Sequence, residues 1–543
     1  MKNILFILLC LIYLDASAQT NQQIGRFEQS QIVNNKIVTK IITNPLVNTG
    51  ENRLINENQY TPKSSVNASS VTWNFLDPYA IANDMMISGD GTVGYCGWSL
   101  NSKRVSAYGN ANSTPFWEFN TSTLGYRNYI ASSDTGIVAV GAYLNFYLFD
   151  KNSNTPLFNF DLTTLPDTGT AGPTGITSNG GFFVATANRN DTSTIFGFNK
   201  SSNISVWKFR VPTAIQGVKI SGNDSLVIVN TYSYYWVLNT FTGAIRYSAA
   251  STGGTQTNQC ISGNGNIIAI INYMGQVKVY QWNGSTYNFL WQYQEPTGTY
   301  YNWISAIDVS YDGNYIAAGT LIFVTSSTYD GRIRYFKVSN GSVPLWSYTG
   351  MLDEVSWVAF SKNGKILTAS SWGDINELKA DFVVFKTSQN VNIPIFALNK
   401  PGSPYACSVS NDGTTAIVGG KAVNARAFGY GGTFYNVFID TATGNVSVGN
   451  ISGNIPNEYK LEQNYPNPFN PTTNIKYQIP NNSFVTLKVY NILGKEITTL
   501  VNEEKKAGYY EVKFSNNQLP GGVYFYRLQT NGFTDTKKLI LVK

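Results

Sequence analysis

The sequence predicts an all-β protein in which an eight-bladed β-propeller is followed by a small immunoglobulin-like β-sandwich. Three observations support this class. Aromatic residues make up 14% of the chain, charged residues only 13%, and there are 48 glycines, as many short strands and tight turns require. A short motif recurs through the middle of the chain at the spacing of a propeller blade. Near the C-terminus, apolar residues alternate in VTLKVYNI and GYYEVKF between turn-forming residues, which is typical of antiparallel strands.

The N-terminus has the three parts of a secretory signal peptide. Met1 and Lys2 bring positive charge, residues 4–14 form an apolar run, and residues 16–18 (ASA) provide a small-residue cleavage site. We therefore expect residues 1–18 to be removed. Neither this run nor any later stretch is long enough to span a bilayer as a helix.

Residues 19–70 are rich in Asn, Gln and Thr and nearly lack aromatics, which predicts a linker with one hairpin around Ile32 to Ile42. Beyond it the chain holds Cys96, Cys260 and Cys407, too sparse a set for a disulfide framework. Their expected strands lie in different blades, so we predict three buried free thiols.

The propeller prediction depends on a motif of the form apolar-Ser/Thr-x-Asp/Asn-Gly, which tolerates the positive φ of a tight hairpin turn. Eight copies occur, and some are degenerate. Their Ser or Thr residues are at 88, 132, 177, 221, 262, 310, 361 and 410, a spacing that fits four-stranded blades.

Each motif is followed by an apolar strand, a strand with alternating aromatics and, in most repeats, an outer strand of the form aromatic-x-aromatic. A further copy of that outer strand, Trp73-Asn74-Phe75, precedes the first motif, whereas the eighth repeat has no convincing one of its own. We predict that the N-terminal copy completes the eighth blade and closes the ring over residues 71–450, which removes an open sheet edge. Seven blades would result if the repeat that contains GAIRYSA is miscounted, and GNVSVGN from Gly444 is the alternative outer strand of the last blade.

The repeats resemble WD-repeat-like and quinoprotein-like propellers, at the level of fold and repeat only. The Trp-Asp dipeptide and its Gly-His partner are missing. The adjacent cysteines and metal carboxylates of quinone-dependent alcohol dehydrogenases are not recognisable either, so their activity is not implied and no cofactor is expected.

Residues 457–543 resemble the type-A sorting domain of the type IX secretion system of the Bacteroidetes. The resemblance rests on the Pro466-Asn467-Pro468-Phe469 segment, the strand up to Gly494, the LPGGVY hairpin from Leu519 and the basic end. It implies transport to the periplasm, recognition by the type IX secretion machinery, passage across the outer membrane and removal of the domain. The mature protein is then secreted or attached to the outer face of the outer membrane.

Composition also excludes several functions. The chain has no histidine, which excludes Ser-His-Asp and Cys-His catalysis and His-ligated metals. The net charge of +6 is modest and dispersed, so nucleic-acid binding is not expected.

Carboxylate chemistry stays open, with three candidates. Asp353 and Glu354 fall in a loop, where solvation is the simpler interpretation, and the same holds for Asp374 with Glu377. Asp308 lies on an inner strand where six of the seven counterparts are uncharged, the exception being Lys219. There we favour structural pairing or solvation.

A binding site is expected where the loops that join each outer strand to the next inner strand gather around the channel mouth. These loops and the first residues of the strands beside them hold aromatic residues that we expect to be exposed, together with a few charged residues. Such side chains are suited to stacking on sugar rings or binding a peptide. The candidate ligand-binding residues are Tyr126, Arg127, Tyr301, Trp303, Asp353, Glu354, Trp357 and Tyr405. We favour a propeller that binds a polysaccharide or a protein. The alternative is a carbohydrate-active enzyme, a glycosidase or lyase, that uses carboxylates on the same face.

Overall fold

The computed structural model describes residues 26–33, 36–43 and 69–542, except for 101–102, 122–126, 167–168, 190–191, 252–255, 299, 374–379, 400–401, 428–430, 442–446, 451–458, 465, 481–482, 506–507 and 516–518. The chain divides into two compact units, residues 1–450 and 451–543. In the part that is described, no helix combines the length and apolar character that a membrane crossing needs. The expected signal peptide lies outside the described residues.

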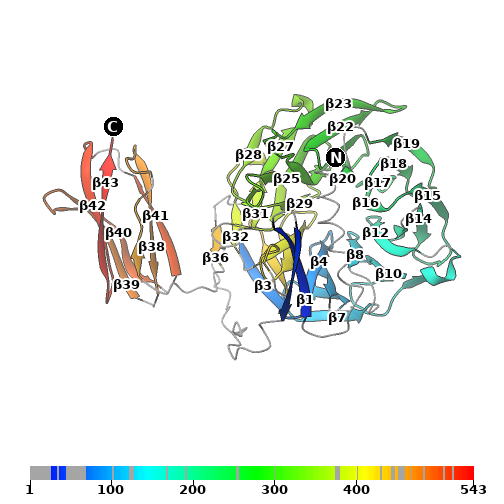
Figure 1. Ribbon diagram of the computed structural model, residues 1–543, viewed down its shortest axis with the longest axis horizontal. Helices are drawn as coiled ribbons and strands as arrows, with labels where there is room; N and C mark the ends of the chain where they lie inside the picture. Colours follow the sequence, from blue (N-terminus) through cyan, green and yellow to red (C-terminus); the bar gives the residue numbers. More distant parts are fainter. Residues whose placement is uncertain are drawn as a thin grey trace. The chain divides into compact units, whose positions relative to one another are not determined.

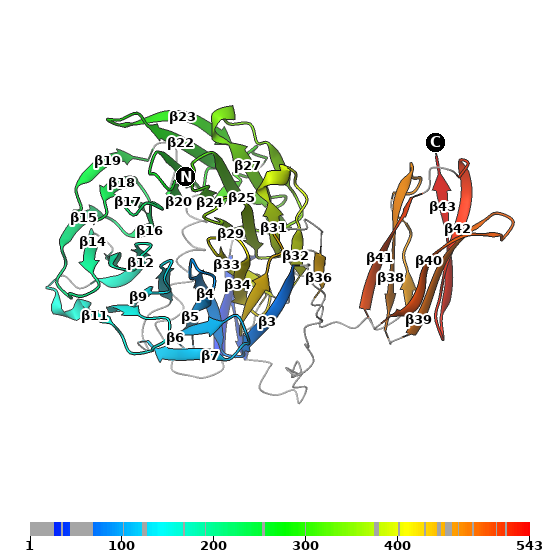
Figure 2. The same ribbon diagram turned by 180° about the vertical axis from the view of Figure 1, so that it is seen from behind.

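Eight of the sheets formed by the described residues of the first unit are blades arranged in a ring (Figures 1 and 2), and their neighbouring strands are antiparallel except at β36. In seven of these blades, consecutive strands run from the centre of the ring to its rim. The first four blades are β4 (Ala80–Ile87), β5 (Val93–Leu100), β6 (Arg104–Gly109) and β7 (Pro115–Asn120); β8 (Asn128–Ser132), β9 (Val138–Ala142), β10 (Asn145–Phe149) and β11 (Phe158–Asp161); β12 (Thr170–Ile176), β13 (Phe182–Asn188), β14 (Thr192–Asn199) and β15 (Trp207–Pro212); and β16 (Ile215–Ile220), β17 (Leu226–Thr231), β18 (Tyr234–Asn239) and β19 (Ile245–Ala250).

The remaining blades follow in the same order around the ring. They are β20 (Gln256–Ile261), β21 (Ile267–Asn272), β22 (Gln276–Trp282) and β23 (Tyr287–Gln294); β24 (Trp303–Val309), β25 (Tyr315–Phe323), β27 (Ile333–Lys337) and β28 (Trp346–Tyr348), with β26 (Tyr329–Asp330) added to β25; β29 (Val355–Phe360), β30 (Ile366–Ser371), β31 (Phe382–Lys386) and β32 (Phe396–Asn399); and β33 (Ser403–Val409), β34 (Thr415–Lys421) and β35 (Gly432–Phe438) with β3 (Ser70–Asp77). The described blades also contain three short 3-10 helices. One follows the fourth strand of the second blade, η2 (Leu162–Thr164). The other two lie between the third and fourth strands of the sixth and seventh blades, η3 (Val338–Asn340) and η4 (Thr387–Gln389).

The expected outer strands are present, and the sequence pattern explains how they hold neighbouring blades together. Second strands such as β21 (IIAIIN) are buried along their whole length, because packed blades cover both faces. Outer strands bury alternate side chains. In three of them the buried Trp also donates its indole N–H to the next blade: Trp117 to the Lys151 carbonyl (3.0 Å), Trp207 to Thr240 (2.9 Å) and Trp291 to Val338 (3.0 Å).

The ring closes as the sequence predicts. Strand β3 pairs antiparallel with β35, with Phe75 opposite Phe434, and so supplies the outer strand of the eighth blade. The alternative prediction, in which GNVSVGN is the outer strand of the eighth blade, is wrong. Residues of GNVSVGN form β36 (Ser447–Asn450), which instead pairs parallel with β32 at the edge of the seventh blade. The linker hairpin is also present, as β1 (Arg26–Val33) paired with β2 (Lys36–Thr43).

The recurring motif forms the turn between the first and second strands of every blade. In each turn the Ser or Thr hydroxyl accepts a hydrogen bond of 2.8–3.1 Å from a backbone N–H four or five residues later. In seven turns it also donates to the Asp or Asn two residues on, over 2.5–3.0 Å. One expected position is wrong. In the second blade Ser133, not Ser132, has this role and pairs with Thr135, because that copy of the motif is one residue out of register.

These turns bond to one another around one end of the ring, which we call the turn face. Asn411 donates to the Gly89 carbonyl (2.9 Å), Gly89 to Ser133 (3.2 Å) and Gly263 to Tyr311 (2.8 Å), and similar bonds join most neighbouring turns among the described residues. Gly89 is required here because a Cβ would lie 2.4 Å from both the Asn411 and Asp134 side chains. At this position the turns of neighbouring blades therefore pack too closely for a larger side chain.

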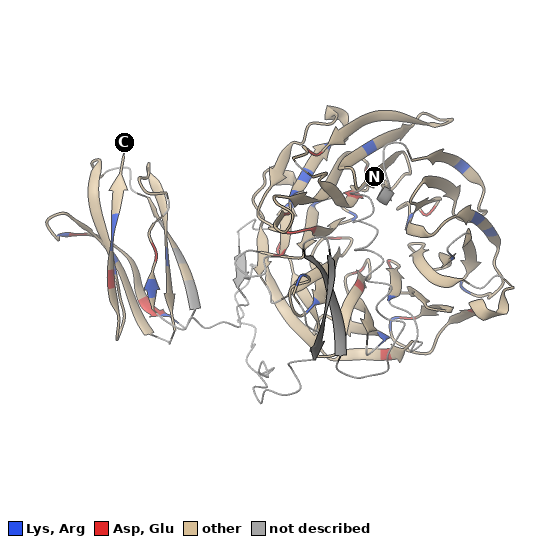
Figure 3. Cartoon of the chain, viewed as in Figure 1, with Lys and Arg blue, Asp and Glu red and all other residues tan. Residues whose placement is uncertain are grey.

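The three described cysteines, Cys96, Cys260 and Cys407, are buried and free, as their predicted strands imply. Burial raises the pKa of the Cys407 thiol to about 12. Charged residues are dispersed among the blades rather than gathered on one of them (Figure 3).

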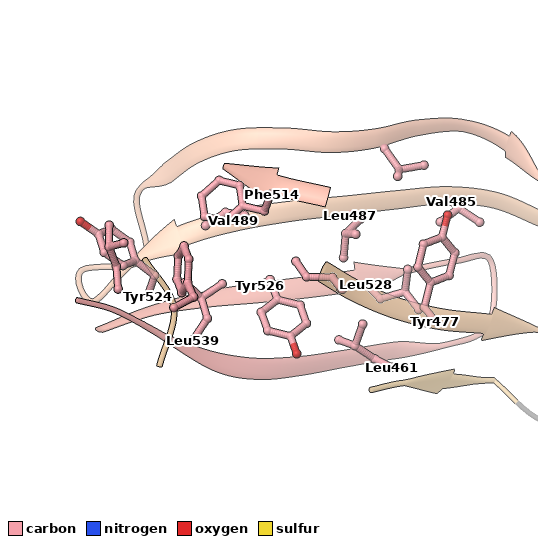
Figure 4. Close-up of a cluster of buried hydrophobic side chains, with 14 of the residues drawn as sticks. Leu461, Tyr477, Val485, Leu487, Val489, Phe514, Tyr524, Tyr526, Leu528 and Leu539 are labelled. Atoms are coloured by element: carbon pink, nitrogen blue, oxygen red, sulfur yellow. The ribbon is translucent and has the colours of Figure 1, made fainter. Parts of the chain in front are cut away.

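The second unit is a β-sandwich of two antiparallel sheets. One sheet contains β37 (Lys460–Leu461), β38 (Thr472–Ile479) and β41 (Gly508–Ser515), and the other β40 (Glu496–Lys505), β39 (Ser483–Asn491), β42 (Gly522–Gln529) and β43 (Thr534–Leu541). Alternating residues such as Val485, Leu487 and Tyr526 form the core between the sheets (Figure 4). This arrangement agrees with the expected small sandwich.

Candidate functional site

The expected ligand-binding residues that the structure describes lie at the end of the ring opposite the turn face, which we call the loop face. Because strands alternate in direction, this face collects the loops from each outer strand to the next inner strand and also the loops from second to third strands. Tyr301 is 56% exposed there, and Trp303 begins β24. Tyr126 lies outside the described residues.

Asp353 is buried rather than solvated, which corrects the simpler interpretation of its loop. The carboxylate forms a two-point ion pair with Arg426, over 2.7 Å to Nε and 2.8 Å to Nη2. It also accepts the backbone N–H of Glu354 at 2.6 Å. Burial alone would lower the pKa of Arg426, but the hydrogen bond and charge of Asp353 outweigh it and raise this pKa. The pair joins the loop before β29 to the loop between β34 and β35.

Arg426 also joins aromatic rings of different blades. Its guanidinium lies 3.4 Å from the ring centroid of Tyr329 and 5.2 Å from that of Trp372, distances at which a cation is attracted to an aromatic face. The Asn424 amide donates to the Trp372 carbonyl at 3.1 Å, which fixes the loop that carries Arg426 against the seventh blade.

A continuous series of rings extends from both sides of Arg426. Centroid distances are 4.7 Å between Tyr273 and Trp303, 5.3 Å between Trp303 and Phe323, and 5.5 Å between Phe323 and Tyr329. On the other side, Trp372 and Tyr405 are 6.0 Å apart. We call this series the aromatic arc. Its members are all half-buried and come from the fifth to eighth blades: Tyr273, Trp303, Phe323, Tyr329, Trp372 and Tyr405.

Glu354 is half-buried and lies close enough to Tyr273 and Tyr405, the two ends of this arc, to affect their pKa values. Its carbonyl accepts the Trp372 N–H at 2.9 Å. Burial raises the pKa of its carboxyl to about 7; the neighbouring Asp353 charge adds to this rise and Arg426 opposes it. In turn, burial and the Glu354 charge raise the pKa of Tyr405 to about 12. Burial, Tyr232 and Glu354 together raise the pKa of Tyr273.

Two other ion pairs are separate from the arc. Asp308 binds Lys219 at 2.6 Å and accepts the Phe360 N–H at 2.9 Å. The two charges at equivalent positions of inner strands therefore pair with each other across blades. This agrees with the structural pairing that the sequence favoured for Asp308. Arg127 lies 3.7 Å from Asp84, in the first two blades. Burial raises the pKa of Asp84, and the Arg127 charge opposes this.

The remaining candidates are not part of the arc. Trp357 packs against the hydrophobic cluster between the eighth and first blades. Asp374 and Glu377 lie outside the described residues. Among the residues that are described, no group of three or more His, Cys, Asp or Glu side chains could hold a metal ion.

Sequence reasoning missed Arg426, Trp372, Tyr329, Phe323 and Tyr273. All of them lie in or beside loops between second and third strands, which the sequence argument did not consider. The alternation of strand direction was the available signal, because it places these loops on the same face as the expected ones.

In the second unit, the Pro466–Phe469 segment binds the last strand, β43. Phe469 is 2% exposed, donates its N–H to the Ile540 carbonyl and accepts that of Val542, both at 2.9 Å. The Asn467 side chain accepts the Ile540 N–H at 2.9 Å. Pro466 and Pro468 are exposed. The segment thus secures the C-terminal edge of the sandwich.

Residues 463–543 match the family described as the secretion system C-terminal sorting domain. The β-propeller domain of Cps50 (Swd1) from Myceliophteria thermophila is 11% identical, with a TM-score of 0.43, over 56% of this chain and 96% of that one. The Dos1 propeller is 17% identical, with a TM-score of 0.45, over 54% of this chain and 76% of that one. A search of curated protein sequences found no match.

The ring of blades makes the first unit a β-propeller, and the family match shows that the chain carries a type IX secretion sorting domain. That domain directs its export, to the medium or to the surface of the outer membrane.

Proposed function

We propose that the propeller binds a carbohydrate through the aromatic arc on its loop face. The observation that carries this proposal is the continuity of the arc over four blades, with ring-to-ring distances of 4.7–6.0 Å interrupted only by Arg426. A series of half-buried rings offers several apolar platforms for successive sugar rings, at low conformational cost.

Arg426 and Asp353 organise this surface. Their bidentate pair fixes loops from the seventh and eighth blades, and the guanidinium contacts rings from the sixth and seventh. A surface that is rigid before binding loses less entropy when the ligand arrives.

The enzymatic alternative has weaker support. Glycosidases generally use two carboxyl groups, one as acid and one as base or nucleophile. Both oxygens of Asp353 are engaged by Arg426, so of the two neighbouring acids only Glu354 is available for chemistry.

The test is binding of the full chain to a polysaccharide panel, with release of reducing ends measured in the same samples. We expect binding without hydrolysis. Trp372→Ala and Trp303→Ala, at two members of the arc, should each weaken binding at least tenfold, whereas Phe116→Ala, at a rim position that is 60% exposed, should leave it unchanged. Failure to bind any glycan, or equal binding by the four proteins, would contradict the proposal.

A further inference from the structure

Among the described residues, one carboxylate of the loop face has no cation bonded to it. The two acids of the loop before β29 differ in this respect. Asp353 is paired with Arg426 at 2.7 and 2.8 Å, whereas the structure shows no ion pair or hydrogen bond to the Glu354 carboxylate from any residue in the described part of the chain. Glu354 is nevertheless half-buried, so its charge is only partly solvated.

The charged and titratable groups that face Glu354 come from four elements. Asp353 precedes it in the same loop, Arg426 lies in the β34–β35 loop, Tyr405 is on β33, and Tyr273 is in the β21–β22 turn. Arg426 is the only cation among these groups, and it is already engaged by Asp353. The raised pKa of Glu354, at about 7, agrees with a carboxylate whose charge is insufficiently compensated.

Both tyrosines belong to the aromatic arc and contact a tryptophan of it. Tyr405 contacts Trp372 at 6.0 Å on one side, and Tyr273 contacts Trp303 at 4.7 Å on the other. A carboxylate beside several aromatic rings is the combination that binds organic ammonium groups, because the charge and the ring faces both attract a cation. A neutral sugar ring would use the rings and leave the charge unpaired.

We propose that Glu354 and the adjacent rings of the arc form a receptor for the ammonium group of an amino sugar in the bound glycan. This inference rests on the proposed carbohydrate-binding function. A glycan fits better than a lysine side chain because the arc extends over four blades, far more than one side chain occupies.

The experiment compares two hexasaccharides with one backbone by calorimetry at pH 6.5 with the full chain: the chitosan hexamer, which has free amines, and its fully N-acetylated form. We expect the wild-type protein to prefer the free-amine hexamer at least tenfold. Glu354→Gln should reduce this preference to less than twofold and leave the affinity for the acetylated hexamer unchanged. Glu496→Gln, the same change at an exposed site in the sorting domain, should behave as the wild type.

The outcomes separate the two proposals. Equal affinity for both hexamers, or a preference that survives Glu354→Gln in a variant with an unchanged melting temperature, would overturn the ammonium receptor and leave carbohydrate binding intact. Binding of a lysine-rich peptide with no binding of either hexamer would overturn both.

Discussion

The closing strand β3 provides the most direct test of the propeller architecture. Trp73 is 7% exposed and lies between the eighth and first blades, with its ring 5.5 Å from that of Tyr108 and 5.6 Å from that of Phe434. Its indole nitrogen has no hydrogen-bond partner in the described part of the chain, so replacing it removes packing and leaves no orphaned polar partner. Trp73→Ala should therefore lower the free energy of unfolding by about 3–5 kcal/mol, the usual cost of deleting a large buried aromatic side chain.

The matched control is Phe116→Ala on β7, the outer strand of the first blade. Phe116 is 60% exposed, so its removal should change stability by less than about 0.5 kcal/mol. Both variants are compared by chemical denaturation followed by tryptophan fluorescence, with aggregation monitored by light scattering. Trp73→Ala should also aggregate more readily, because loosening β3 exposes the edge of β35. Equal stability of the two variants would refute the conclusion that β3 closes the ring.

Three further predictions concern export, the thiols and Glu354. Deleting residues 457–543 should leave a folded propeller in the periplasm, and normal amounts of the truncated protein outside the cells would reject the role of the sorting domain. The three buried thiols should react with a thiol reagent only after denaturation; rapid modification of the native protein would show that at least one is accessible. The pKa of Glu354 is raised from 4.5 to about 7, so the folded state binds its proton more tightly than the unfolded state. The tighter proton binding stabilises the folded state. This contribution to the free energy of unfolding is fully present below pH 4.5 and is lost as the pH rises through 7, by at most roughly 3 kcal/mol. Glu354→Gln should flatten this pH dependence in denaturation curves, and an unchanged slope would contradict it.

The ring could be predicted from the sequence because the residues that form each turn are close together in the chain. An apolar residue, a hydroxyl, an Asp or Asn and a glycine are adjacent in the chain, and their hydrogen bonds close a turn within a few residues, as at Ser88 and Ser310. The closing strand was predictable for the same reason, since Trp73-Asn74-Phe75 repeats the pattern of the other outer strands. The parallel pairing of β36 with β32 was not, because no local pattern specifies an additional strand at a blade edge.

The loop face could be predicted only in part. Asp353 and Glu354 are adjacent in the sequence and look equivalent there. Their different states depend on Arg426, 73 positions away from Asp353, which pairs with one of them and leaves the other unbalanced. No spacing rule connects these residues, since each belongs to a loop of a different blade. The loops between second and third strands also lie on this face, and their charged residues include Arg426. The sequence does not indicate which of the two acids Arg426 binds.

The two ends of the ring differ because the repeat constrains one and not the other. On the turn face, backbone bonds between neighbouring turns, such as Asn411 to Gly89 at 2.9 Å, require nearly the same geometry in each blade. A Cβ on Gly89 would lie 2.4 Å from neighbouring side chains, so a larger residue is penalised at that position. The loop face has no such motif, and its loops differ in length and composition, from the short turn at Tyr273 to the longer loop that holds Tyr329. Loops on a rigid scaffold can accumulate binding residues at little cost in stability. Together with the unbalanced carboxylate and the aromatic arc on that side, this asymmetry is the structural reason to look for the ligand at the loop face.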